Sequence, residues 1–183
     1  MYVDLLKEWQ QAINLVSAST LPMVWERHVL DSVQVAKYIP QTQKPPCLVD
    51  LGSGAGFPGM VLAIMGVGTV HVIESDQRKC VFLREVARAT DTAVTVHTCR
   101  IEAAKPFPAD IITARALAPV DRLLTYAKPF LAAQTRCLFL KGRNVESELT
   151  QIDPRWTYAM TQHPSQTEEG AVVLELNEVQ CDL

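Results

Sequence analysis

Apolar residues recur at helical spacing in the first part of the chain. Residues 2–14 repeat them at i, i+3 and i+7, and residues 22–38, with Pro22 in the first turn, repeat them at every fourth position. Such spacing predicts two helices. The Pro-rich stretch of residues 40–46 has no periodicity and separates these helices from the rest. We therefore expect an N-terminal helical extension over residues 1–40.

From residue 47 the pattern changes to short β-branched runs that alternate with helical stretches. The runs cover residues 47–51, 69–74, 93–98, 110–114 and 136–141. The helical stretches between and after them cover about residues 58–66, 76–90, 119–132 and 145–152. Strand and helix in turn predict βαβ units and hence a parallel sheet.

Two further strand-like runs follow the last helical stretch. They cover residues 156–162 and 171–180, and the polar turn between them predicts a hairpin. The predicted fold class is therefore α/β, a mostly parallel sheet with a C-terminal antiparallel strand and an N-terminal helical extension. Because 183 residues without an internal repeat suit one domain, we expect a single domain over residues 1–183, with a Rossmann-like core over 47–183.

Composition narrows the class of protein. Hydrophobic residues make up 48% of the chain, yet no apolar run reaches the roughly 18 residues of a membrane span. The start carries acids at Asp4 and Glu8 instead of the basic n-region of a signal peptide, so we expect a soluble cytoplasmic protein. We also expect a monomer. Five scattered cysteines without a CxxC pair indicate reduced thiols and no metal site. Three residues are expected in the core rather than as base-stacking platforms: Trp9, Trp25 and Trp156.

Charge is distributed unevenly along the chain. The net charge is −3, but residues 78–143 hold twelve Lys/Arg against five acids, a local +7, and the remainder sums to −10. Such asymmetry is typical of an acidic protein that turns one basic side toward a polyanion. A set of solvated helix faces would give the same numbers, so both interpretations stay open.

Four of the eight glycines fall within eight positions, directly after the first predicted strand. These are Gly52, Gly54, Gly56 and Gly59, and Pro58 suits the start of the next helix. Glycine lets the backbone take positive φ and lets a ligand approach without a Cβ in the way. The segment therefore predicts a nucleotide-type cradle between strand and helix.

The glycine spacing alone does not choose the nucleotide. It satisfies the dinucleotide pattern G-x-G-x-x-G, and Glu74 ends the second strand twenty residues after Gly54. Asp50, followed by "LGSGAG", looks instead like the D-x-G-x-G-x-G of class I S-adenosylmethionine methyltransferases, in which this carboxylate helps hold the amino-acid moiety of the cofactor. A nicotinamide-dependent oxidoreductase stays open as an alternative, disfavoured by Asp50 and by the lack of a catalytic His or Tyr-Lys pair.

Further motifs carry a resemblance to a known family. They are "INLVS" (13–17), "ERHVLDS" (26–32), "DLGSGAGFPGMVLAI" (50–64), "VIESDQRKCVFLREV" (72–86), "RIE" (100–102), "ITARALAPVDRLL" (112–124) and "LFLKGRN" (138–144). Over nearly its whole length the chain resembles the RsmG (GidB) family, bacterial 16S rRNA guanine-N7 methyltransferases. The resemblance implies a Rossmann-like class I fold and methyl transfer from S-adenosylmethionine to N7 of a guanosine, position 527 in the family's assignment.

The resemblance also implies which residues hold the cofactor. The glycine turn and the bulky residue after it contact S-adenosylmethionine, the acid after the second strand takes the ribose, and a pair after the third strand borders the adenine. In this sequence the set is Asp50, Gly52, Gly54, Phe57, Glu74, Ile101, Glu102 and Arg115. Arg115, at the end of the fourth strand beside cofactor and target, is the catalytic candidate, because open α/β sheets bind ligands at that edge.

RNA contacts are expected from a second set of residues: Arg27, His28, Arg122, Lys141 and Arg143. Each could instead have a structural role, at the base of the helical extension or on a solvated surface. Asp31 and Ser32 are expected to fix Arg27 or His28. Where the family usually has Asn-Lys, this chain has Gln10-Gln11, and family members usually carry a further helical segment ahead of the equivalent of Leu5, so we expect a shortened N-terminal region.

The sequence lacks the motifs that are typical of other classes of nucleic-acid methyltransferase. An exocyclic-amine enzyme shows Asp/Asn-Pro-Pro-aromatic after the fourth strand, where this chain reads "ARALAP", and Cys47 precedes the first strand instead of lying on the catalytic edge. Guanine N7 needs neither device, since its lone pair is available at neutral pH; alignment and charge stabilisation suffice. The sequence also leaves open a methyltransferase of another RNA or of a small molecule, and a non-catalytic RNA-binding module.

Overall fold

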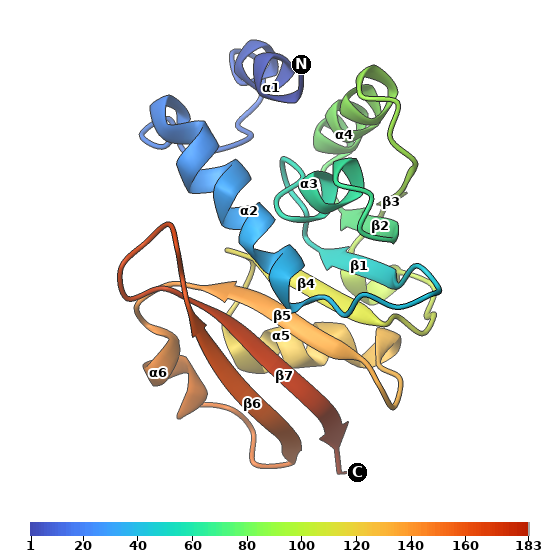
Figure 1. The fold of residues 1–183 in the computed structure, drawn as a ribbon, viewed down its shortest axis with the longest axis vertical. Helices are drawn as coiled ribbons and strands as arrows, with labels where there is room; N and C mark the ends of the chain where they lie inside the picture. Colours follow the sequence, from blue (N-terminus) through green and yellow to red (C-terminus); the bar gives the residue numbers. More distant parts are fainter. Residues whose placement is uncertain (183) are drawn as a thin grey trace.

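A seven-stranded sheet runs through the centre of the molecule (Figure 1) in the computed structural model, which describes residues 1–182. Its strands are β1 (Cys47–Leu51), β2 (Thr69–Glu74), β3 (Val94–Thr98), β4 (Ile111–Arg115), β5 (Arg136–Lys141), β6 (Trp156–Pro164) and β7 (Val172–Cys181). The helices are α1 (Tyr2–Trp9), α2 (Asp31–Val33), α3 (Gly59–Ile64), α4 (Gln77–Ala89), α5 (Val120–Ala127) and α6 (Val145–Leu149). Strand and helix alternate as predicted, and β1, β2 and β5 have the predicted bounds.

The strand order is β3-β2-β1-β4-β5-β7-β6. Strands β1 to β5 are parallel, whereas β7 is antiparallel to both β5 and β6. The predicted hairpin and its C-terminal antiparallel strand are confirmed, with β7 inserted between β5 and β6 so that β6 forms the edge. The order reverses between β1 and β4, and ligands of open α/β sheets bind at the carboxyl ends of strands beside such a switch point.

Helices cover both faces of the sheet. Helices α3 and α4 pack on one face together with the N-terminal extension, and α5 and α6 pack on the other (Figure 1), so that two apolar cores form, one on each side. Because β1 and β4 are buried on both faces, most of their residues are apolar. Among residues 1–182, no helix is long and apolar enough to cross a membrane.

The N-terminal extension is helical but less regular than predicted. Helix α1 ends at Trp9 rather than near residue 14, because the Gln10 side chain binds the next loop: its Oε1 accepts from the backbone N–H groups of Leu15 and Val16, and its Nε2 donates to the carbonyl of Val16. Gln10, one of the two residues that differ from the family pattern, thus fixes the loop that follows α1.

The second helical segment begins with a 3₁₀ turn and widens to π-helical geometry over Trp25–Leu30 before α2 and a closing 3₁₀ turn, Gln34–Tyr38. The wider turn changes which positions face inward: the buried ones are Val24, His28, Ser32, Gln34 and Val35. The expectation that Trp25 lies in the core is therefore wrong.

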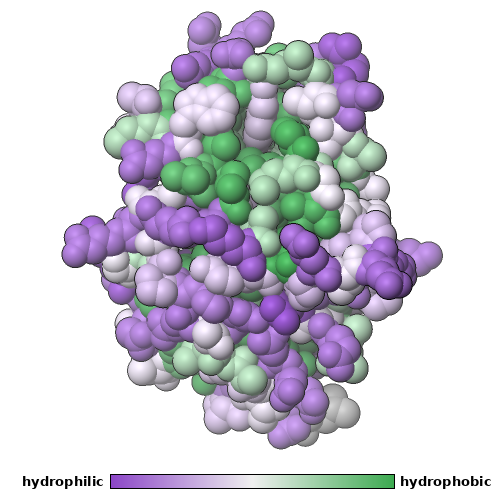
Figure 2. All heavy atoms as spheres, in the orientation of Figure 1, coloured by the Kyte–Doolittle hydropathy of each residue, from purple (hydrophilic) through white to green (hydrophobic). Residues whose placement is uncertain are grey.

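Trp25 is 65% exposed, whereas Trp156 is buried and Trp9 packs partly buried against the core. Figure 2 shows hydrophobic side chains gathered on the upper half of the face that carries α2 and α3, with mostly hydrophilic residues below.

Candidate active site

The turn after β1 has the conformation that its glycines predict. Gly52 and Gly54 have φ of 62° and 57°, in the left-handed region that side chains other than glycine rarely adopt. A Cβ on Gly52 would lie 2.6 Å from Leu117 Cδ1, so that position is closed by packing. A Cβ on Gly54 would meet only a carbonyl oxygen at 3.9 Å and would project into open space. The turn therefore presents bare backbone at Gly54.

Glu74 joins the ends of β1 and β2. One carboxylate oxygen accepts a hydrogen bond from Gly54 N–H at 2.8 Å, and the other accepts from Asp76 N–H at 2.8 Å. Asp76 in turn begins α4 by accepting from the backbone N–H groups of Arg78 and Lys79. A carboxylate held at the end of the second strand suits the hydroxyl groups of a ribose.

Asp50 lies beneath the turn rather than in the open space above it. Its carboxylate is fully buried and accepts hydrogen bonds from Thr113 Oγ1 at 2.7 Å and from Gly59 N–H at 3.2 Å. Burial raises the pKa of this carboxyl group to about 6, against the opposing effect of its hydrogen bonds. The geometry gives Asp50 the role of holding β4 and the start of α3 against the turn.

A cleft of about 370 Å³ opens over the turn at the carboxyl ends of β1, β2 and β4. Seven of the eight residues expected to hold the cofactor line it: Gly52, Gly54, Phe57, Glu74, Ile101, Glu102 and Arg115. Asp50 is the exception. Cys99, which the sequence did not single out, also lines this cleft. We call this space the first cleft.

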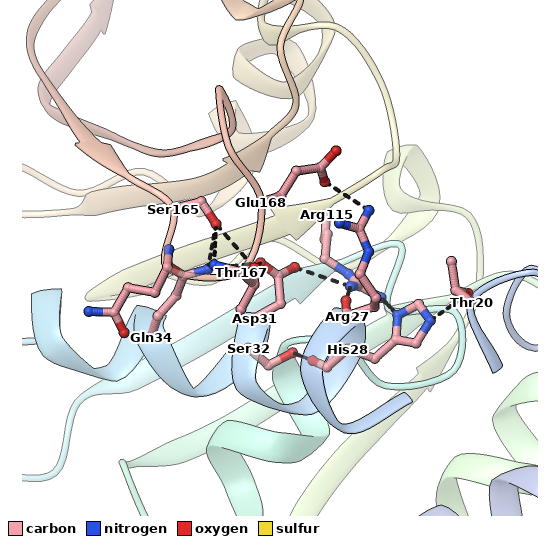
Figure 3. A network of polar contacts seen from close by, with 11 residues as sticks. Thr20, Arg27, His28, Asp31, Ser32, Gln34, Arg115, Ser165, Thr167 and Glu168 are labelled. Carbon is pink, nitrogen blue, oxygen red and sulfur yellow. Dashed lines mark hydrogen bonds and ion pairs between the residues drawn. The ribbon is translucent and has the colours of Figure 1, made fainter. Parts of the chain in front are cut away.

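Arg115 stands at the end of β4 with its side chain largely buried. Nη1 donates to the carbonyl oxygen of Arg27 at 2.9 Å and to Asp31 Oδ2 at 3.2 Å, and Nη2 lies 2.7 Å from His28 Nδ1 (Figure 3). The guanidinium carbon also sits 5.2 Å from the ring centre of Phe57, a cation–π contact. Asp31 was expected to fix Arg27 or His28; it fixes Arg115.

The tautomer of His28 follows from these contacts. An arginine can only donate, so Nδ1 of His28 must accept and carries no proton. Nε2 then carries the proton and donates to Thr20 Oγ1, 2.8 Å away. Burial, followed by the charges of Arg115 and Arg27, lowers the pKa of His28 to about 4. His28 is therefore a neutral acceptor at physiological pH.

Acid should weaken the folded state through His28. Its pKa is about 4 when folded and ordinarily about 6.5, so between these values the unfolded chain binds more protons and stability falls as pH falls. Asp50, with its raised pKa, acts in the opposite sense below about pH 6. In His28→Asn the first effect is gone. We expect the free-energy cost of His28→Asn, measured by urea unfolding, to shrink by about 2 kcal/mol between pH 7 and pH 4; a cost independent of pH would contradict a neutral His28.

Phe57 is enclosed by residues of the N-terminal extension. Its ring stacks with that of Tyr2 at 5.4 Å between centroids and with that of His28 at 5.1 Å. The hydroxyl group of Tyr2 donates to the carbonyl oxygen of Ala55 inside the glycine turn. Helix α1 thus braces the turn directly, a role that periodicity could not reveal because Tyr2 and Ala55 are 53 residues apart in sequence.

A second cleft, of about 750 Å³, lies on the other side of Arg115. Its walls come from the helical extension, the ends of β4 and β5 and the turn between β6 and β7; they include Thr20, Arg27, His28, Asp31, Lys141 and Thr167. Arg115, Ala116 and Leu117 line both clefts. Ala116 has φ of 51°, a strained conformation of the kind that collects at functional sites.

The candidate RNA contacts are in different environments. Arg27 pairs with Glu168 at 2.8 Å and lines the second cleft together with His28. Lys141 is largely buried, with Nζ 2.6 Å from Glu148 and bonded to the carbonyl of Ala118, so its charge is already neutralised. Arg143 and Arg122 are exposed.

The twelve basic residues of the segment 78–143 do not form one surface. The α4 set and the α5 set lie on opposite faces of the sheet (Figure 1), and Arg88 and Arg136 are paired with acids. Of the two interpretations that the sequence left open, the structure therefore does not support a single basic side. Within residues 1–182, no three His, Cys, Asp or Glu side chains gather as a metal site would require.

A sheet of this strand order, with a cleft over the glycine turn of its first strand, is the architecture of the class I S-adenosylmethionine-dependent methyltransferases. Magnesium protoporphyrin IX methyltransferase (ChlM) of Synechocystis PCC 6803, solved with bound SAM, has the same fold: the TM-score is 0.65 with 97% of each chain covered, at 10% identity. Residues 1–173 match the family described as rRNA small subunit methyltransferase G (GidB), and the chain belongs to this family.

Curated relatives agree with this assignment over nearly the whole chain. The ribosomal RNA small subunit methyltransferase G of Paramagnetospirillum magneticum is 56% identical over 98% of this chain and 86% of its own length. That of Rhodospirillum centenum is 51% identical over 97% of this chain and 82% of its own length. The family resemblance stated from the motifs is confirmed.

Proposed function

We propose that the protein transfers the methyl group of S-adenosylmethionine to N7 of a guanosine in 16S ribosomal RNA, position 527 in the family's assignment. The observation that carries this proposal is the arrangement of two clefts that meet at Arg115, in a chain that belongs to the rRNA small subunit methyltransferase G family over residues 1–173. One cleft suits a nucleoside cofactor, and the other is open to a larger, polar substrate.

The residues of the first cleft fit S-adenosylmethionine. The bare backbone at Gly54 lets a ligand approach, and Glu74 offers carboxylate oxygens to the ribose hydroxyls. Ile101 and Glu102 line the same cleft and would border the adenine. When bound there, the cofactor supplies an electrophilic methyl carbon on a positively charged sulfur. Asp50 acts from below by fixing the turn.

The second cleft is the proposed place of the guanine. N7 of guanine has a free lone pair in the plane of the base, so the protein has no proton to remove before transfer. What remains for its side chains is to hold the base in line with the methyl carbon and to exclude water. Arg115 borders both clefts and would keep the two ligands in register.

RNA contacts are proposed for the exposed Arg122 and Arg143 and, in the wall of the second cleft, for Arg27. His28 is buried with both ring nitrogens bonded, which supports a structural role instead of the expected RNA contact. The buried pair of Lys141 and Glu148 supports a structural role for Lys141 instead. Because a single chain forms both clefts, we propose a monomer that acts in the cytoplasm on 16S rRNA or the small ribosomal subunit.

The direct test is incubation of the protein with labelled S-adenosylmethionine and either naked 16S rRNA, a precursor particle or the mature small subunit, followed by mapping of the modified base. We expect label on N7 of one guanosine, detected by chain cleavage after mild reduction and aniline treatment. Label on a cytosine, on an exocyclic amine or on a small molecule instead of these RNAs would contradict the proposal.

The N7 chemistry predicts a rate that depends little on pH. No general base or thiolate is required, and the His28 and Asp50 pKa values of about 4 and 6 lie below the range of the test. We expect the single-turnover rate at saturating RNA to vary less than about threefold between pH 6.5 and 8.5. Cys99 is the cysteine of the first cleft, and Cys99→Ala should keep the single-turnover rate within a few-fold of the wild-type rate. A tenfold change with a midpoint near pH 7, or an inactive but folded Cys99→Ala, would point to a catalytic nucleophile.

A further inference from the structure

Arg115 is held from three directions by groups of the N-terminal helical segment. The contacts with the Arg27 carbonyl, Asp31 and His28 use three of its five N–H groups, and within residues 1–182 the other two have no protein partner. Its side chain and that of Asp31 are only 17% and 18% exposed, so this geometry is well shielded from water. The orientation of the two remaining N–H groups is therefore set by these three contacts.

The contact with His28 is one link of a directed chain. Arg115 donates to Nδ1 of His28, Nε2–H donates to Thr20 Oγ1, and the Thr20 hydroxyl donates to the carbonyl oxygen of Ser17 at 2.9 Å. Donor and acceptor are fixed at each link of this chain, because reversing one hydrogen bond would break the next one. The loop after α1, through Ser17 and Thr20, thereby fixes the His28 tautomer that accepts the hydrogen bond from Arg115.

Asp31 connects Arg115 to the opposite wall of the second cleft. Its Oδ2 accepts from Arg115, while its Oδ1 accepts from Gln34 Nε2 at 2.8 Å and from Thr167 Oγ1 at 2.7 Å (Figure 3). Thr167 belongs to the turn between β6 and β7. Gln34 binds the same turn, since its Oε1 accepts from Gln166 N–H at 3.0 Å. Together with the Arg27–Glu168 ion pair, these contacts hold the β6–β7 turn against the N-terminal helical segment.

We infer that His28 and Asp31 are positioning residues for Arg115, and that Thr167 extends this support to the β6–β7 turn, so that the walls of the second cleft and the arginine between the clefts form one rigid unit. This inference rests on the proposed function only in that Arg115 acts on cofactor and target. It adds that the substrate cleft itself sets the geometry of the transfer step. Small displacements of such a group cost large factors in rate.

The test begins with the protein alone, by nuclear magnetic resonance of nitrogen-labelled side chains. At pH 7 we expect His28 with a bare Nδ1 and a protonated Nε2, and an Arg115 guanidinium whose rotation is hindered. In His28→Leu the Arg27 carbonyl and Asp31 still hold Nη1, but rotation about the bond from Cζ to Nη2 should become faster. In His28→Asn, which keeps an acceptor near the position of Nδ1, the slower rotation should return. A protonated Nδ1, or rotation of Nη2 as slow in a folded His28→Leu as in the wild type, would overturn the inference whether or not the protein methylates RNA.

Kinetics then separate positioning from mere stability. At saturating cofactor and rRNA, His28→Leu should lower kcat by about tenfold or more, with KM and cofactor affinity within about threefold; His28→Asn should recover most of the rate. Thr167→Val should lower kcat about threefold to tenfold, whereas Thr161→Val, an exposed threonine of the same hairpin, should not change it. Wild-type kcat in folded His28→Leu and Thr167→Val would contradict the inference, while an inactive wild-type protein would contradict the proposed function instead.

Discussion

Gly54→Val should abolish binding of S-adenosylmethionine while the chain still folds. The Cβ at this position would project into the open space of the first cleft, and a branched side chain would fill the place where a ligand meets the backbone. We expect the dissociation constants of S-adenosylmethionine and its demethylated product to rise at least about a hundredfold by calorimetry. Methyl transfer should fall in parallel.

A matched variant separates the loss of space from backbone strain. Gly54 has a φ of 57°, so valine also costs roughly 1–2 kcal/mol of conformational energy there. Gly66 has a φ of 70° and nothing within 4 Å of an added Cβ, and it follows α3 outside both clefts. Gly66→Val should lose similar stability and bind the cofactor normally. A folded Gly54→Val that binds as well as Gly66→Val would remove the cofactor assignment.

The Rossmann-like core was predictable because its signals are local. A strand buried on both faces is mostly apolar, and the short apolar runs that result gave β1, β2 and β5 their bounds. The glycine turn was predictable for the same reason, since positive φ after a buried strand strongly favours glycine. Seven of the eight residues expected to hold the cofactor then line one cleft, because the carboxyl ends of parallel strands share one edge of the sheet.

What periodicity could not supply is the set of contacts between distant segments. Asp31 and Arg115 are 84 residues apart, and nothing local marks them as partners. Arg27 and His28 were recognised as important without their roles, which depend on the arginine that reaches them from β4. The spacing of apolar residues also assumed a regular α-helix, whereas the segment is π-helical over Trp25–Leu30 and Trp25 lies at the surface. The basic residues of the segment 78–143 do not share one surface, because α4 and α5 cover opposite faces of the sheet.

Arg136 offers a matched control for the catalytic candidate. It begins β5 at the opposite end of the sheet, donates to the carbonyl oxygen of Tyr38 in the helical extension and pairs with Glu175 at 3.1 Å. Its contacts therefore resemble those of Arg115, a backbone carbonyl and a carboxylate, but it lines neither cleft. Alanine substitutions at the two positions should cost comparable stability, about 1–3 kcal/mol each, because each removes the arginine from a partly buried carboxylate that keeps its other hydrogen bonds.

Arg115→Ala should lower methyl transfer at least about a hundredfold, whereas Arg136→Ala should leave it within a few-fold. We expect this difference because Arg115 lies between the two clefts, where it would hold both ligands in line. Alignment of reacting groups can change a rate by a factor of this size. The measurement is the single-turnover rate at saturating rRNA and cofactor, with folding checked by urea unfolding. Loss of the Arg115 charge should also raise the pKa of His28 toward its ordinary value, which a nuclear magnetic resonance titration would detect. Equal rates in the two folded variants would show that Arg115 serves only the architecture of the site.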